Sequence, residues 1–184
     1  MSGRSRESPA RRRERHGQIE DPEVVLAAAL RFLEARSRSI TEVRRRLTGA
    51  GYRPELVDGA ITRLIELGVL DDEQFARLWI ESRDRARPRG ERALRQELAL
   101  KGVDRALVDE LLEDRRVGTG GDTSSIDDDA ALKLLRRHAR TLDRVGEPRV
   151  RRQRAYALLA RNGFDSDTAS DAIRRHEERR AASD

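Results

Sequence analysis

The chain contains no cysteine and few aromatic residues, and these absences exclude several classes of protein. Without cysteine there is no disulfide framework, thiolate nucleophile or cysteine-ligated zinc site. Aromatic residues make up only 3% of the chain, which disfavours a β-sandwich or β-barrel because strands favour aromatic and β-branched side chains. No apolar run approaches the roughly 20 residues that a membrane span requires, and the basic start lacks the apolar core of a signal peptide. We therefore expect a soluble cytoplasmic protein that does not bind membranes.

Charged residues dominate what the sequence does contain. They account for 40% of the chain, whereas hydrophobic residues account for 36%. The core must therefore be thin and the surface densely ionic. The abundance of Ala, Leu, Arg and Glu favours helices, and the net charge of +5 is compatible with an anionic partner.

An internal repeat organises the chain around Gly51, Gly102 and Gly163. Apolar residues recur eight and four residues before each glycine, and one, six and ten residues after it. These columns contain, in order, Val43, Leu94 and Ala155; Leu47, Leu98 and Leu159; Tyr52, Val103 and Phe164; Val57, Val108 and Ala169; and Ile61, Leu112 and Ile173. Units of about 50 residues are only marginally stable alone, so repeated units stack on one another. We predict an all-α fold of three tandem three-helix repeats in an elongated, curved, solenoid-like module.

Capping signals and breakers give the boundaries of these repeats. Asp21 precedes a proline at a first helical position, and Ser39 stands three residues before Glu42, as in a capping box. The predicted organisation is a disordered basic arm (1–20), repeat 1 (21–68), repeat 2 (69–116), a Gly-rich linker (117–126) and repeat 3 (127–180). The arm is predicted to be disordered because no apolar residue is available to anchor it.

The apolar spacing also predicts which helix faces are buried. The first helix of repeat 1 is expected to bury Leu26, Ala29, Leu30 and Leu33, and the first helix of repeat 2 is expected to place Phe75, Leu78, Trp79 and Ser82 on one face.

No catalytic or metal-binding constellation is present in the sequence. The histidines lie far apart and are expected at the surface: His16, His138 and His176. Residues 118–121 are Gly-rich but lack the Lys-Ser/Thr of a phosphate-binding loop. The aspartates at 71–72 and 127–129 stand at predicted helix starts, where they are best interpreted as caps. We expect neither an enzyme nor a cofactor.

Two basic clusters are the best candidates for a binding surface. Residues 83–101 contain seven basic and three acidic residues, and residues 136–154 contain eight basic and two acidic residues. Both clusters fall where the first and second helices of a repeat meet. Guanidinium groups bind phosphates and carboxylates equally well, so a solvated surface and a binding surface both stay open. The candidate contact residues are Arg77, Arg83, Arg87, Arg89, Arg92, Arg95, Lys101, Arg149, Arg151 and Arg152.

The sequence of repeat 2 resembles the RecX family of RecA regulators. The resemblance rests on Gly-Val-Leu-Asp-Asp-Glu-Gln-Phe-Ala at 68–76, then Arg83, Gly90 and Glu-Leu-Ala-Leu-Lys-Gly-Val at 97–103. Residues 39–43 with Leu47 resemble the first family repeat, and residues 161–164 resemble the third, so the resemblance covers about 21–180. It implies a protein that lodges in the helical groove of the RecA–DNA filament and restrains ATP hydrolysis, recombination and strand exchange in DNA repair and the SOS response.

The resemblance also suggests partners and roles for individual residues. It implies backbone roles for Gly90 and Gly102 and partner contacts for Arg83 and Lys101. We expect a monomer that binds the RecA filament, and single- and double-stranded DNA through a basic face. Two alternatives stay open, namely a helix-turn-helix-like module that binds DNA without RecA, and a helical scaffold for an acidic protein.

Overall fold

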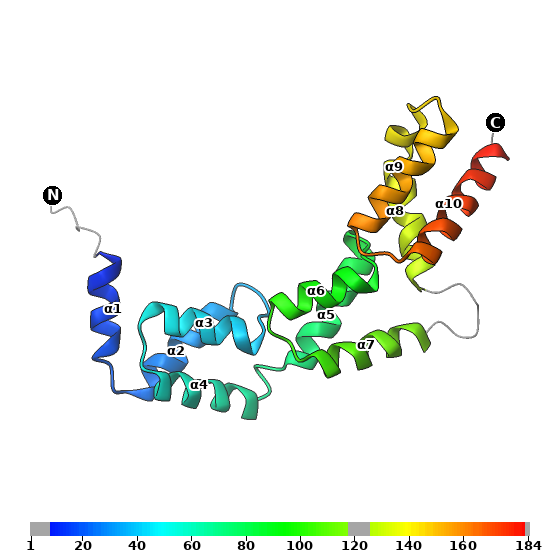
Figure 1. Cartoon of the computed structure of the whole chain (residues 1–184). Helices are drawn as coiled ribbons and strands as arrows, with labels where there is room; N and C mark the ends of the chain where they lie inside the picture. The colour runs from blue at the N-terminus through cyan, green and yellow to red at the C-terminus, as the bar shows by residue number, and fades with distance from the viewer. Residues whose placement is uncertain (1–7, 118–125, 183–184) are drawn as a thin grey trace. The chain divides into compact units, whose positions relative to one another are not determined.

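The computed structural model describes residues 8–117 and 126–182, and over these residues the chain is entirely helical. It forms ten α-helices and no β-strand there, which confirms the all-α class (Figure 1). The helices are α1 (Pro9–Gly17), α2 (Pro22–Leu33), α3 (Ile40–Ala50), α4 (Pro54–Glu66), α5 (Asp72–Ala86), α6 (Glu91–Leu100), α7 (Arg105–Val117), α8 (Ile126–Asp143), α9 (Pro148–Arg161) and α10 (Ser166–Ala181). Residues 118–125 of the predicted linker (117–126) lie outside the described residues.

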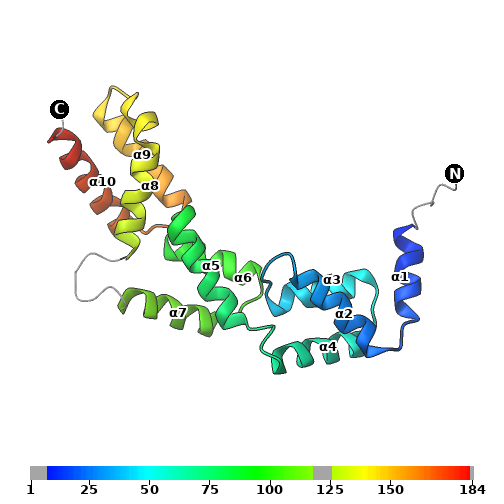
Figure 2. The same cartoon turned by 180° about the vertical axis from the view of Figure 1, so that it is seen from behind.

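Internal contacts divide the chain into two units. The first unit contains the residues up to Phe75 together with Lys101–Val103, and the second contains Ala76–Leu100 and the chain from Asp104 onward. In the first unit α2, α3 and α4 pack on one another and α1 packs on α3; in the second, α6 packs on α7, and α8, α9 and α10 form a bundle (Figures 1 and 2). The elongated, curved arrangement of the repeats stays a prediction.

The residues of the five apolar columns are all buried. None of them is more than 9% exposed. In the first unit the column residues of repeat 1 pack with Val25, Ala29 and Leu64 in one core. In the second unit the columns of repeat 3 pack with Ala131 and Leu135. The repeat read from the sequence therefore supplies the core, and each buried Leu or Val contributes about 1.5–3 kcal/mol relative to an exposed one.

Two predicted helix faces were only partly right, since Ala29 and Phe75 are buried as predicted but at least one other residue of each face is exposed. On α2, Leu30 is 40% exposed whereas Val25 is fully buried; on α5, Leu78 is 46% exposed whereas Ala76 and Ile80 are buried. Both helices carry more apolar residues than one stripe needs. The sequence period therefore fits two neighbouring faces, and packing against the other helices selects between them.

The prediction of a disordered arm was also wrong for the part of it that the structure describes. Residues 9–17 form α1, which has no buried residue. Ser8 caps this helix by accepting a hydrogen bond from the backbone N–H of Arg11, and Pro9 occupies the first turn. Local capping thus favours the helix, although its composition offers no apolar face.

Polar contacts hold α1 against the end of α3. Arg13 Nε donates to the carbonyl of Gly49 at 2.9 Å, and His16 Nδ1 donates to the carbonyl of Ala50 at 2.8 Å. The His16 ring also stacks on Tyr52, with 4.4 Å between ring centroids. His16 is therefore half-buried rather than at the surface. Terminal carbonyls of α3, which have no partner inside their own helix, replace the missing apolar anchor.

The three repeat glycines allow the chain to turn and another segment to approach closely. Gly51, Gly102 and Gly163 follow the second helix of each repeat and have φ angles of 100°, 76° and 86°, in the left-handed region that favours glycine. A side-chain carbon at Gly51 would lie only 2.7 Å from the Arg13 carbonyl oxygen, and one at Gly102 or Gly163 would overlap Thr41 or Ala93. No other residue type fits these positions without displacing a neighbour.

Within the first unit, the start of α3 binds the residues around Gly102. Ser39 Oγ donates to the carbonyl of Lys101 at 2.6 Å, and Thr41 Oγ1 donates to that of Gly102 at 3.3 Å. In return, Lys101 Nζ donates to Glu42 Oε1 at 2.7 Å. Ser39 and Glu42 also form the predicted capping box. The capping residues of α3 therefore serve a second purpose in tertiary packing.

Two aspartates that were interpreted as caps of their own helices cap a different helix. Asp72 Oδ1 accepts from the backbone N–H of Ile40, the first residue of α3, at 2.8 Å. Asp127 Oδ2 accepts from the backbone N–H of Glu91, the first residue of α6, at 3.0 Å. Only Asp71 caps α5 as predicted, through the backbone of Gln74. The sequence shows which residue types are good caps but not which helix end lies nearby.

Replacing Gly163 with alanine should destabilise the second unit. The substitution places a side chain at positive φ, which costs about 1–3 kcal/mol, and forces it against the Ala93 backbone. Gly146→Ala is the matched control, because a side-chain carbon there meets nothing within 4 Å. Thermal melting followed by circular dichroism should show a lower midpoint for the first variant only. Equal midpoints would contradict this role for Gly163.

Glu42 should make the stability of the first unit depend on pH. Burial alone would raise the pKa of Glu42, but hydrogen bonds from Lys101 and the Ser39 backbone, with nearby positive charge, lower it overall. A lowered pKa stabilises the fold above the unfolded value of about 4.3, and this stabilisation is lost as pH falls through the folded value. Glu42→Gln should therefore lower the melting midpoint at pH 7, and the deficit should shrink on acidification. A deficit that is constant from neutral to acidic pH would argue against the ion pair, and Glu66→Gln, at an exposed site, is the control.

Candidate binding surface

Glu97 on α6 forms ion pairs with two of the predicted contact arginines, Arg83 and Arg89. Arg83 Nε donates to Glu97 Oε2 at 2.6 Å, and Trp79 Nε1 donates to the same oxygen at 2.8 Å. Arg89 Nε lies 3.2 Å from Glu97 Oε1. The Arg83 guanidinium also lies over the Trp79 ring, 4.3 Å from its centroid. The Arg83 side chain is only 20% exposed, and this arginine joins α5 to α6.

Arg89 joins the α5–α6 corner to the turn after α9. Its Nη1 donates to Asn162 Oδ1, and the backbone N–H of Gly90 donates to the carbonyl of Asn162 at 3.0 Å. The Asn162 amide in turn donates to the carbonyl of Leu158 at 2.7 Å. Arg89 Nε is buried and its ion pair with Glu97 lacks hydrogen-bond geometry. Arg89 and Gly90 are thus parts of the junction between repeats 2 and 3.

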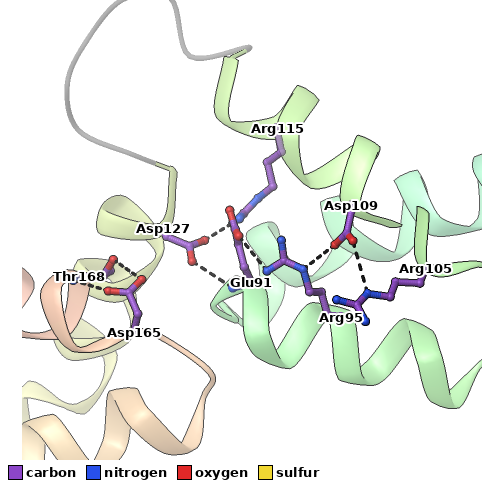
Figure 3. A network of polar contacts seen from close by, with 8 residues as sticks. All are labelled: Glu91, Arg95, Arg105, Asp109, Arg115, Asp127, Asp165 and Thr168. Carbon is purple, nitrogen blue, oxygen red and sulfur yellow. Dashed lines mark hydrogen bonds and ion pairs between the residues drawn. The ribbon is translucent and has the colours of Figure 1, made fainter. Parts of the chain in front are cut away.

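Arg95 belongs to a network on α6 and α7 (Figure 3). Its Nε donates to Asp109 Oδ1 at 2.8 Å and its Nη1 donates to Glu91 Oε2 at 3.1 Å. Arg105 approaches the other oxygen of Asp109, at 3.6 Å. The hydrogen bond from Arg95 lowers the pKa of Asp109, and the same bond raises the pKa of Arg95. At physiological pH the Arg95 guanidinium is therefore charged, and its charge is balanced by carboxylates of the same chain.

Arg115 is the most deeply buried cation of this region, and the sequence analysis did not identify it. Its side chain is 6% exposed and pairs with Asp127 at 2.6 Å and with both oxygens of Asp84 at 2.8 and 3.0 Å. Burial alone would lower the pKa of Arg115, but the bonds to the two carboxylates raise it. Burial raises the pKa of Asp127 in spite of its partner. No local pattern marks Arg115, because its partners are distant in sequence.

Four further candidates also bind groups of the chain itself. These pairs are Arg77 with Asp114 at 3.3 Å, Lys101 with Glu42 at 2.7 Å, Arg151 with the carbonyl of Val145 at 3.1 Å and Arg152 with Glu177 at 2.6 Å. Most of the predicted contact residues are thus engaged in holding helices together.

Three candidates remain exposed, and we call them the free arginines: Arg87, Arg92 and Arg149. Among the residues that the structure describes, none of these side chains has a partner. Arg87 directly follows α5, Arg92 is the second residue of α6 and Arg149 is the second residue of α9. All three lie where the first and second helices of a repeat meet. Arg144, which is also exposed, directly follows α8 and so lies at the corresponding corner of repeat 3.

The described part of the chain contains neither a membrane-spanning helix nor a group of side chains that could hold a metal ion. None of its helices is long and apolar enough to cross a membrane. Over the same residues, no group of three or more His, Asp or Glu side chains is placed to hold a metal ion.

Comparison with family models matches all three repeats. The first three-helix domain of RecX matches residues 26–64, the second matches residues 71–112 and the third matches residues 126–173. The matched segments follow one another in the family order and exclude α1.

Comparison with curated proteins and solved structures agrees. "Regulatory protein RecX" of Mycobacterium sp. (strain JLS) is 35% identical over 150 residues, covering 80% of this chain and 78% of the relative. The protein of the same name from Chlorobium phaeobacteroides (strain BS1) is 32% identical over 148 residues, covering 79% and 88%. The crystal structure of RecX from Lactobacillus salivarius shares the fold, with a TM-score of 0.69 at 19% identity over 86% of this chain and 97% of that one. With the three domains in order and these identities over most of its length, the chain belongs to the RecX family.

Proposed function

We propose that the protein is a non-enzymatic regulator that binds the RecA nucleoprotein filament in its helical groove. Binding would inhibit RecA ATPase, recombinase and strand-exchange activity, and so regulate DNA repair and the SOS response in the cytoplasm. The observation that carries this proposal is the presence of all three RecX domains, in order, in one chain.

A chain of joined repeats offers a physical means of inhibition. A ligand shifts a conformational equilibrium only by its differential affinity for the two states. A protein that contacts neighbouring filament subunits binds best to one arrangement of them. The subunit movements that accompany hydrolysis would then break contacts with the bound protein, so they would become less favourable.

The free arginines are the best candidates for contacts with the filament. Arg83, Arg95 and Lys101 already pair with carboxylates, so a partner could recruit them only by breaking those pairs. An exposed, unpaired guanidinium pays no such cost and binds phosphate or carboxylate oxygens bidentately. The contact surface would therefore lie at the helix corners rather than at the centre of the basic cluster.

Charge reversal of the free arginines should weaken inhibition without unfolding the protein. The test measures RecA ATP turnover on single-stranded DNA against concentration of this protein. Replacing Arg87, Arg92 and Arg149 with Glu should raise the half-inhibitory concentration about tenfold or more. The control replaces Arg63, Arg105 and Arg174 with Glu; these are exposed but paired within the chain, and the change in net charge is the same.

Different outcomes separate the possible failures. If the native protein leaves turnover unchanged up to stoichiometric amounts, the regulatory function is wrong. If both triple variants lose inhibition equally, the effect is one of net charge and the residue assignment is wrong. Salt-sensitive binding to DNA alone, without any effect on turnover, would instead support the helix-turn-helix alternative.

A further inference from the structure

A strongly basic pocket lies in the first unit, between α1, α2 and α3. Its volume is about 660 Å³. The positively charged or basic residues that line it are Arg12, Arg13 and His16 from α1, Arg31 from α2, and Arg45 and Arg46 from α3. Among the described residues that line it, none is Asp or Glu. Basic residues of three helices thus line one space, and Arg12, Arg13 and Arg45 among them already have partners within the chain.

This concentration of charge selects an anionic ligand. Like charges held close together repel, and the repulsion falls when an anion binds between them. Guanidinium groups present planar pairs of N–H donors that match phosphate oxygens. Phosphate groups, with several oxygens and up to two negative charges, can be bound by arginines from more than one helix.

The pocket also has an aromatic wall. Phe32, Tyr52 and His16 line it; the His16 ring stacks on the buried Tyr52 ring, and the two are nearly parallel, at 6°. The Arg46 guanidinium lies 5.6 Å from the centroid of the Phe32 ring. Aromatic and guanidinium planes are the surfaces on which nucleobases stack. The space is larger than a phosphate alone requires, which leaves room for a nucleoside.

We propose that α1, α2 and α3 form a binding site for a nucleotide. The arginines bind its phosphate and the aromatic wall binds its nucleoside. The nucleotide comes either from single-stranded nucleic acid or from a free nucleoside triphosphate. This inference goes beyond the proposed function, because α1 lies outside the three matched RecX domains and the site does not require RecA.

Binding at this site should stabilise the docked position of α1. Arg13 and His16 join α1 to the last carbonyls of α3, and the same helix supplies part of the phosphate site. A ligand that binds only the docked arrangement increases its population by mass action. The amides of residues 9–17 should therefore exchange hydrogen more slowly when the site is occupied.

The test uses the full-length chain and two probes. A fluorescein-labelled ten-nucleotide oligo(dT) reports binding by anisotropy, and unlabelled ATP serves as competitor. Arg31→Gln with Arg46→Gln should weaken oligo(dT) binding about tenfold or more. The control, Arg44→Gln with Arg63→Gln, removes the same charge from the same unit outside the pocket and should change affinity less than about twofold. Hydrogen exchange of residues 9–17 is measured with and without each probe.

Each result supports or overturns the site. Competition by ATP identifies a free nucleotide as the ligand; binding of oligo(dT) that ATP does not displace identifies nucleic acid. Unchanged exchange in α1, equal loss of binding in both variants, or equally tight binding of poly-glutamate would overturn the proposal. RecA inhibition is measured separately on the same variants, so the pocket can fail while the regulatory function holds, and the reverse.

Discussion

The close approach of another segment to the left-handed glycine of each repeat is the constraint on which the rest of the structure depends. Gly51, Gly102 and Gly163 end the second helix at positive φ, and another segment lies where a side chain would be. α1 occupies this place at Gly51, the start of α3 at Gly102 and the start of α6 at Gly163. Each three-helix repeat, which would be only marginally stable alone, thereby gains an interface with another segment. α1 uses the same kind of site, although it belongs to none of the three repeats.

Many ionic groups of this protein form ion pairs that hold its helices together. A chain with 40% charged residues has few apolar side chains with which to join its helices. Carboxylates such as Glu97 and Asp127 therefore gather arginines from neighbouring helices. Exposed pairs of this kind contribute little individually, but breaking a buried pair such as Arg115–Asp127 costs about 3–5 kcal/mol. A cluster of arginines in the sequence is thus a poor guide to a binding surface unless their partners are known.

The two proposed anion-binding regions differ in character. The free arginines are isolated, solvated side chains at helix corners, suited to reversible contacts that weaken with salt. The pocket beside α1 instead combines several guanidinium groups with aromatic rings. Its cations come from three helices, so its geometry depends on α1 being docked. Regulation of a filament and binding of a nucleotide would then act through different parts of the chain.

The sequence by itself determined the helical class, the three repeats, their core columns and the glycines between helices. These features follow from local chemistry, since helix period, capping and positive φ are properties of neighbouring residues. Tertiary structure alone decided that Leu30 and Leu78 are exposed, that α1 is docked rather than disordered, and that Asp72 and Asp127 cap other helices. It also decided which arginines are free. Each of these outcomes depends on which distant groups meet, and a linear pattern does not contain that information.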